Sequence, residues 1–268
     1  MTLEAHQAPK RLAALGPTAL QDRAALIIGA SRGIGASTAE ALVATGARVV
    51  LASRDTQALE SLAADLRSRG GDAWAKSTDM LNPAEVAAAV AFTVEKFGGL
   101  DIAVNNAGVS AKAALLADIP DEEFDRLLQI NVRSVFVAMK HQIRAMLARG
   151  GGAIVNTASI GGLVGLPFMA AYTASKHALV GLTRVAALDY AKAGIRVNAV
   201  APGTVMTRML RSGAAATPEG EARLRALAPM GRIAEPEEVA GAIAWLCSDA
   251  ASYVTGVAFP IDGGYTVP

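Results

Sequence analysis

Residues 26–42 read LIIGASRGIGASTAEAL, an apolar run that passes through a glycine-rich turn into a helix-forming stretch. Gly29, Gly33 and Gly35 permit a tight turn and let the backbone approach a pyrophosphate, whose charge the N–H groups of a helix N-terminus attract. Their spacing is G-x-x-x-G-x-G and not the commoner G-x-G-x-x-G, but the strand–turn–helix context is the one this mechanism requires. The stretch predicts a nucleotide-binding βα unit.

Apolar runs and helix-like stretches alternate along the rest of the chain. We expect strands at 25–28, 47–52, 73–77, 100–104, 153–157, 196–200 and 257–261, and helices near 34–45, 56–69, 83–97, 121–149, 168–193 and 236–248. Such alternation implies a parallel sheet covered on both faces. The prediction is α/β: one doubly wound Rossmann domain over residues 21–268 with a seven-stranded parallel sheet. Residues 1–20 are expected to form a loosely held tail.

One long connection, residues 202–235, breaks the alternation because it holds no strand-like run. Long connections in compact domains are often functional, and we expect a substrate lid around residues 204–230. A poorly ordered surface insertion is the alternative.

Composition narrows the function classes. The 268 residues are 52% hydrophobic with a net charge of +1, which gives no electrostatic case for nucleic acid or an acidic membrane surface. No signal peptide or membrane span is evident, because the long uncharged stretch 150–175 is broken by asparagine, glycine and proline. The single cysteine, Cys247, favours a buried thiol in a reducing cytoplasm. The three histidines lack ligand-like spacing, so no metal site is expected.

Tyr172 and Lys176 are four residues apart in a helix-like stretch and therefore share a helix face. An ammonium close to the phenol favours its ionised form and lowers a pKa that is normally near 10. Such a phenol can exchange a proton with an alcohol or carbonyl oxygen. Standing alone, the pair also fits a half-buried ring beside a solvated ammonium. Together with a nucleotide turn, which supplies a hydride carrier, it indicates an oxidoreductase.

The end of the second strand, VVLASRD, bears on the choice of cofactor. A carboxylate there would bind the adenosine ribose of NAD. Ser53 is neutral instead, and Arg54, helped by Arg32, is suited to pair with a 2′-phosphate. We predict NADP(H). In the competing interpretation Arg54 is solvated and Asp55 caps the next helix.

Several motifs together resemble the short-chain dehydrogenases/reductases. They are GASRGIG, NNAG at 105–108, Asn131, Ser159, YTASK at 172–176 and PGTVMT at 202–207, in the family's order and approximate spacing. The resemblance runs from about residue 21 to the C-terminal DGGYT. Ile28 departs from it, because many members carry threonine there; we expect a cost in local stability rather than in activity.

The resemblance implies roles for four catalytic residues. Tyr172 would be the acid/base, and Lys176 would lower its pKa and bind the nicotinamide ribose. Ser159 would hold the substrate oxygen. Asn131 would interrupt its helix and keep a water in a proton relay to the lysine.

The same resemblance implies cofactor contacts. Asp79 and Met80 would contact adenine, and NNAG at 105–108 would line the adenine-ribose side with Asn106 nearest the cofactor. Pro202, Gly203, Val205 and Thr207 would belong to the loop that holds the carboxamide. The expected cofactor-binding residues are Gly29, Ser31, Arg32, Gly33, Ile34, Gly35, Ser53, Arg54, Asp79, Met80, Asn106, Tyr172, Lys176, Pro202, Gly203, Val205 and Thr207.

For the substrate we favour a fairly apolar small carbonyl compound or secondary alcohol, because Phe168, Met206, Met209 and Leu210 offer an apolar wall. Ser159 and Tyr172 complete the expected contacts. A 3-oxoacyl-(acyl-carrier-protein) reductase is the alternative: Arg144 fits one carrier-docking position, but Leu188 stands where the second basic residue usually falls. A non-catalytic NADP-binding regulator is a further alternative, although such proteins typically lose the tyrosine or the lysine.

We also expect a homotetramer. The helices near 121–149 and 168–193 carry more apolar residues than one sheet face would cover, and family members pair these helices across a two-fold axis. The residues concerned are Val135, Val137, Met139, Leu179, Val180 and Leu182. The C-terminal FPIDGGYTVP would form the second interface.

Overall fold

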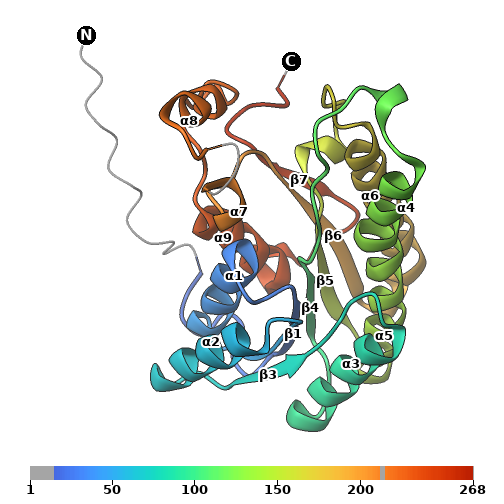
Figure 1. The fold of residues 1–268 in the computed structure, drawn as a ribbon. Coiled ribbons are helices and arrows are strands. Elements are labelled where there is room, and N and C mark those ends of the chain that lie inside the picture. The colour runs from blue at the N-terminus through green and yellow to red at the C-terminus, as the bar shows by residue number, and fades with distance from the viewer. Residues whose placement is uncertain (1–14, 212–214, 268) are drawn as a thin grey trace.

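The computed structural model, which describes residues 15–211 and 215–267, contains a seven-stranded sheet whose neighbouring strands all run parallel (Figure 1). The strand order is β3-β2-β1-β4-β5-β6-β7, so the chain winds outward in both directions from β1 and β4. This confirms the predicted doubly wound α/β fold. The strands are β1 (Ala24–Ile28), β2 (Arg48–Ser53), β3 (Ala73–Ser77), β4 (Ile102–Asn105), β5 (Gly152–Thr157), β6 (Ile195–Pro202) and β7 (Ala258–Ile261).

The α-helices connect these strands and begin and end within a few residues of the predicted bounds. Pro83 begins the third helix after Asn82, whose side chain accepts a hydrogen bond from Ala84 N, and Gly98 ends it in a left-handed conformation. The helices are α1 (Gly33–Ala44), α2 (Thr56–Ser68), α3 (Pro83–Phe97), α4 (Asp121–Leu128), α5 (Ser134–Arg149), α6 (Ala170–Tyr190), α7 (Arg208–Arg211), α8 (Pro218–Arg225) and α9 (Pro236–Cys247).

Two apolar cores lie on opposite faces of the sheet. Successive residues of β1 alternate between them: Leu26 and Ile28 pack with α3, α5 and α6, whereas Ala25 and Ile27 pack with α1, α2 and α9. Because both faces are covered, every residue of β1 and β4 is buried, and all of these residues except Asn105 are apolar.

The predicted helix over 121–149 is interrupted where the family resemblance placed the interruption. A π-helical turn, Gln129–Arg133, separates α4 from α5 and contains the buried Asn131. The Asn131 amide both accepts from Val109 N (2.9 Å) and donates to Val109 O (3.0 Å). The turn thereby joins α4 and α5 to the loop that follows β4.

The two ends of the long connection after β6 lie side by side. Val205 and Ala234 form a single parallel bridge, with Met206 N donating to Ala234 O (2.8 Å). Between them lie α7 and α8, and residues 212–214 of the expected lid lie outside the described residues.

The residue just before the expected domain boundary at residue 21 belongs to the core. Leu20 is buried in the core beside α1 and donates its N–H to Thr45 O (2.8 Å). Residues 1–14 of the expected tail lie outside the described residues.

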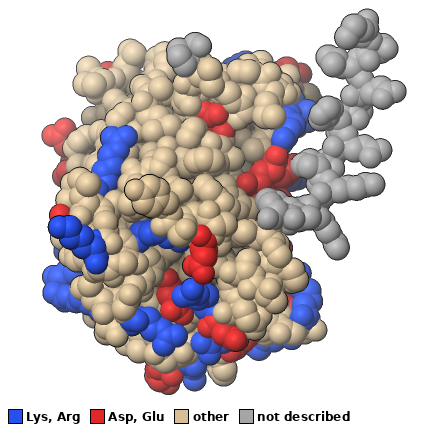
Figure 2. Space-filling view, turned by 180° about the vertical axis from the view of Figure 1, so that it is seen from behind, with Lys and Arg blue, Asp and Glu red and all other residues tan. Residues whose placement is uncertain are grey.

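Charges of both signs are interspersed on the face shown in Figure 2, mostly on its lower half. This mixture agrees with the net charge of +1. Among the described residues, no helix has the length and apolar character needed to cross a membrane.

Candidate active site

A cleft of about 920 Å³ opens where the strands end, at the edge from which the helix-bound loops leave the sheet. The ends of β1, β2, β5 and β6 and the loop that follows β4 all contribute to its walls. Ligands of open α/β sheets bind at this edge.

The glycine turn between β1 and α1 forms one wall, as the sequence predicts. Gly29 has a left-handed backbone (φ +86°), and a Cβ atom there would lie 2.5 Å from Ala107 N. At Gly35 a Cβ atom would lie 2.0 Å from Gly29 O, so only glycine lets the helix approach the strand. Arg32, at the N-cap of α1, makes no side-chain cap hydrogen bond, and the first turn holds no acidic residue. The free backbone N–H groups at the N-terminus of α1 are therefore suited to bind an anion.

The residues expected at the adenosine ribose lie together at the end of β2. Asp55 caps α2 by accepting a hydrogen bond from Ala58 N, as the alternative interpretation proposed. It also pairs with Arg32 at 2.6 Å, a contact that the sequence did not reveal. Arg54 is exposed and lines the cleft beside Ser53.

Tyr172, Lys176 and Ser159 meet at the other end of the cleft. Tyr172 and Lys176 lie one turn apart on α6, and Ser159 follows β5. Lys176 is only 5% exposed, and its Nζ donates to Thr157 O at 2.9 Å and lies 5.7 Å from the Tyr172 ring centroid. A solvated ammonium beside a half-buried ring is therefore excluded.

The pKa expectation for the phenol needs correction. Burial raises the pKa of Tyr172, and the Ser159 hydroxyl beside it acts in the opposite direction, whereas Lys176 makes no resolved contribution. Burial lowers the pKa of Lys176 from 10.5 to about 8. The sequence spacing placed the two side chains on one face correctly, but burial decides their protonation in this structure.

Asn131 is connected to α6 through Ser175, a residue that sequence reasoning missed. Asn131 Nδ2 donates to Ser175 Oγ (3.1 Å), and Ser175 Oγ donates to Tyr172 O (2.7 Å). The serine is fully buried. It links the π-helical turn to the start of α6.

The expected substrate residues are only partly brought together. Leu210 lines the cleft with Ser159 and Tyr172, but Phe168 and Met206 do not. Phe168 is 57% exposed and holds a left-handed backbone (φ 64°), and its carbonyl accepts from Ala114 N. The Met209 side chain lies outside the described part of the structure.

Other residues line the cleft without having been predicted. Some directly follow the NNAG motif or flank the glycine and proline motifs, and this position in the sequence could have identified them. For Leu224 of α8, the only indication in the sequence was its place within the expected lid. They are Ile28, Asp55, Thr78, Leu81, Val109, Ser110, Ala111, Ile130, Thr157, Ala158, Thr204, Arg208 and Leu224, whereas Ala107 and Gly108 belong to the NNAG motif that was expected there. The other predicted cofactor residues line the cleft, apart from Gly35, which packs beneath the turn.

Two further sequence expectations concern reactive side chains. Cys247 is buried, and burial raises the pKa of its thiol to about 12. The thiol therefore stays protonated at neutral pH and is unreactive. Within residues 15–211 and 215–267, no group of three or more histidine, cysteine, aspartate or glutamate side chains is placed to hold a metal ion.

Comparisons with known proteins identify relatives of the whole described domain. A family model described as enoyl-(acyl carrier protein) reductase matches residues 29–266. The 2,5-dichloro-2,5-cyclohexadiene-1,4-diol dehydrogenase of Sphingobium indicum is 46% identical, over 92% of this chain and 98% of that protein. The cyclohexanol dehydrogenase of an Acinetobacter species is 41% identical over 91% and 95%. The crystal structure of levodione reductase is similar with a TM-score of 0.87 and 36% identity, over 91% of this chain and 97% of that one.

Proposed function

This chain belongs to the short-chain dehydrogenase/reductase family, and we propose that it is an NADP(H)-dependent oxidoreductase that interconverts a fairly apolar ketone and its secondary alcohol. The observation that carries the proposal is the convergence of Ser159, Tyr172 and Lys176 at one end of the cleft, opposite an uncapped helix N-terminus suited to an anion. A cleft with both features has a place for a nucleotide and a proton donor for its redox partner.

The residues fit a nicotinamide cofactor, which when bound supplies or accepts the hydride. The glycine turn and the N-terminus of α1 would bind the pyrophosphate. Thr157 lines the cleft, and its buried Oγ1 has no hydrogen-bond partner among the described residues. Lys176 would bind the nearby ribose.

The proton chemistry falls to the chain's own side chains. In reduction, the Tyr172 phenol gives its proton to the carbonyl oxygen, and in oxidation it takes the proton back. The Ser159 hydroxyl donates a hydrogen bond to the same oxygen and stabilises the charge that develops there. Burial keeps the phenol protonated at neutral pH, the form that reduction requires.

The preference for NADP(H) rests on the residues around Ser53. Arg54 and Arg32 both line this end of the cleft, and a 2′-phosphate would compete with Asp55 for Arg32. Arg54→Asp is expected to reverse the preference, whereas Arg54→Ala only weakens it. Equal or better kcat/KM with NADH in the parent enzyme would contradict this assignment.

A six-membered carbocyclic ring is the substrate core we favour. The names of two relatives specify a cyclohexanol and a cyclohexadiene diol. In this chain Val109, Ile130 and Leu210 give the same end of the cleft apolar walls. Leu224 extends that apolar surface from α8.

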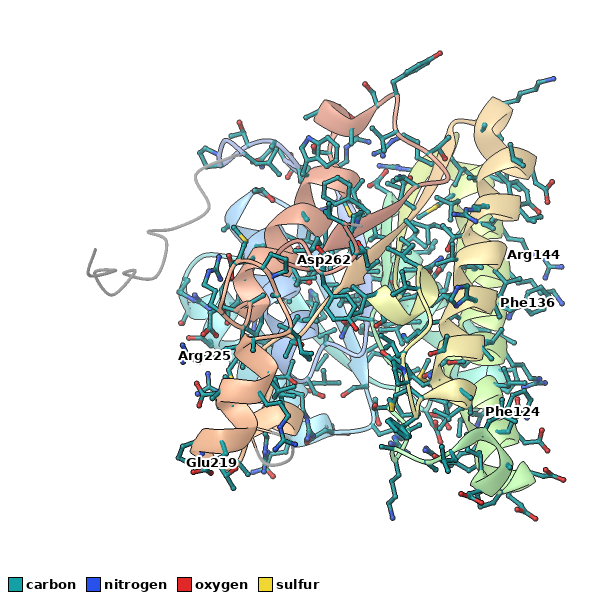
Figure 3. All side chains as sticks on the ribbon, turned by 90° about the horizontal axis from the view of Figure 1, so that it is seen from above. Phe124, Phe136, Arg144, Glu219, Arg225 and Asp262 are labelled. Carbon is teal, nitrogen blue, oxygen red and sulfur yellow. The ribbon has the colours of Figure 1, made fainter. Side chains whose placement is uncertain are left out.

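A carrier-bound 3-oxoacyl substrate is the second candidate. Arg144 is exposed on the outer side of α5 (Figure 3), where an acidic carrier protein has access to it. Leu188, which is 81% exposed, offers the carrier no second charge.

A panel of substrates tests the proposal through the absorbance of NADPH. Cyclohexanone and substituted ring ketones are expected to be reduced with higher kcat/KM than an acyl-carrier-bound 3-oxoacyl thioester. The reverse order would establish the second candidate. NADPH binding without turnover of any member would instead favour a non-catalytic regulator.

The proposed setting is a homotetramer in the reducing cytoplasm. The buried, unpaired Cys247 supports the reducing compartment. The apolar residues offered for the helix interface do not support it, because Val135, Met139, Leu179 and Val180 are buried in the subunit's own core. Exposed residues on the same helices support it better: Phe124 and Phe136 point outward along α4 and α5 (Figure 3), and Val185 and Leu188 are exposed on α6.

A further inference from the structure

The polypeptide between the cleft and α9 contains an arm, residues 215–231, that carries α8. None of the residues of α8 is buried, yet its Leu224 lines the cleft. Figure 3 shows Glu219 and Arg225 of α8 at the outer edge of the molecule. Packing within α8 therefore does not fix where Leu224 lies, and contacts elsewhere must do so.

The C-terminal turn that follows β7 provides such a contact. Met230 N donates to Gly263 O at 3.1 Å. A Cβ atom at Gly263 would lie 3.2 Å from Ala228 Cβ, and one at Gly264 would lie 3.2 Å from Pro229 Cγ. Both glycines have left-handed backbones, so the turn fits closely against the end of the arm.

One carboxylate holds this turn in shape. Asp262 accepts hydrogen bonds from Gly264 N (2.9 Å), Thr266 N (2.9 Å) and Thr266 Oγ1 (2.6 Å). Burial raises the pKa of Asp262, but these hydrogen bonds outweigh it and the pKa lies below its usual range. The carboxylate is therefore ionised at neutral pH.

The same turn also contacts the loop that follows β6. Gly203 N donates to Ile261 O at 3.0 Å, and a Cβ atom at Gly203 would lie 3.0 Å from Asp262 Cα. Gly203 itself lines the cleft beside Pro202. The turn thus lies between the arm and the loop after β6, which lines the cleft.

We propose that Asp262 is a positioning residue: by holding the C-terminal turn against Met230 and Gly203, it fixes Leu224 over the substrate end of the cleft. It touches neither substrate nor cofactor and acts through the arm. The role in turnover rests on the function proposed above, whereas the fastening of the arm does not.

The fastening is tested by the rate at which trypsin cleaves after Arg223 and Arg225, both on α8, without cofactor or substrate. Asp262→Ala is expected to raise this rate about tenfold, because cleavage follows the population of the opened arm. Thr266→Val, which removes one of the three hydrogen bonds, is expected to raise it less. Asp249→Asn removes an exposed carboxylate that pairs with Arg23, far from the arm. This control variant should leave the cleavage rate unchanged.

Kinetics then test the link to the cleft. Both variants are expected to raise KM for the ketone, by about tenfold in Asp262→Ala, with kcat changing much less, because uniform substrate binding is lost. Unchanged trypsin cleavage in both variants would overturn the proposal, and so would faster cleavage with an unchanged KM. Should Asp262→Ala fail to fold, Thr266→Val decides alone.

These outcomes are separable from a failure of the proposed function. If the parent reduces no ketone but Asp262→Ala is cleaved faster at α8, the arm is fastened as described and the reaction assignment is wrong. If the parent is active and the cleavage rates are equal, the positioning role alone is wrong.

Discussion

At the scale of single residues, the phenol of Tyr172 carries the sharpest prediction. Tyr172→Phe should lower kcat by roughly 10²–10⁴-fold, the contribution of a general acid. The ring would keep its packing on α6, so NADPH binding, followed by fluorescence, should be nearly unchanged. Tyr190→Phe, at the end of the same helix and outside the cleft, is the matched control and should retain full activity. Near-normal turnover in Tyr172→Phe would require a different proton donor.

The pH dependence of that reaction follows from the direction of the shift. Because burial raises the pKa of Tyr172 above 10, reduction should persist through neutral pH and decline only as the phenol ionises in alkali. Oxidation, which needs the phenolate, should rise over the same range. If the rate of reduction instead declined around neutral pH, the bound cofactor would have to lower the pKa of Tyr172.

Lys176 links activity to stability. Its pKa is 10.5 in the unfolded chain and about 8 when buried, so between these values the unfolded chain holds a proton that the native protein has released. Stability therefore rises with pH across that window, and at pH 7 the buried charge costs roughly 3 kcal/mol.

Lys176→Met should accordingly be slow and bind cofactor weakly, yet unfold at a higher temperature than the parent at pH 7. The difference should shrink toward pH 10. Lys192→Met, at an exposed lysine beyond the end of α6, should show no such pattern in the same melting series. A melting temperature below that of the parent at pH 7 would mean that the ammonium stabilises the fold through its bond to Thr157 O.

At the scale of elements, the glycine turn and α1 act as one unit. In Gly35→Ala the new Cβ would lie 2.0 Å from Gly29 O, so the helix must move away from the strand. We expect NADPH affinity to fall at least about tenfold, since the backbone N–H groups then miss the pyrophosphate. Gly181→Ala, in the middle of α6 with open space around it, should leave the affinity unchanged and favour its helix by up to about 1 kcal/mol. Equal NADPH affinity in the two variants, measured by titration calorimetry, would contradict this view of the turn.

Sequence patterns predicted the strands well but did not predict the break in the helix over 121–149. All strands were found within two residues, and the central ones are the clearest because burial on both faces makes them mostly apolar. The helix over 121–149 looked continuous, because nothing in its own residue pattern marks the π-helical turn. Only the family resemblance placed a break at Asn131, whose amide bonds to Val109 across the fold.

For the molecule as a whole, the proposed tetramer would assemble through the outer faces of α5 and α6. Light scattering at micromolar concentration should give the mass of a tetramer. Val185→Glu combined with Leu188→Glu should give a smaller species with a normal melting transition, because both side chains are exposed and contribute little to the subunit's own core. A monomeric mass for the parent protein would contradict the proposed tetramer. A double variant with the same mass as the parent would show that the interface lies elsewhere.

The fold class, the glycine turn and the placement of Tyr172 and Lys176 on one helix face could all be predicted from the amino-acid sequence, because each depends on local periodicity or on spacing within one element. The sequence did not determine what lies beside each side chain. The pairing of Arg32 with Asp55, the buried state of Lys176, the exposure of Phe168 and the contact of Met230 with Gly263 all join residues distant in the chain or depend on desolvation. Tertiary structure decided these because burial and long-range contacts exist only once the elements are packed.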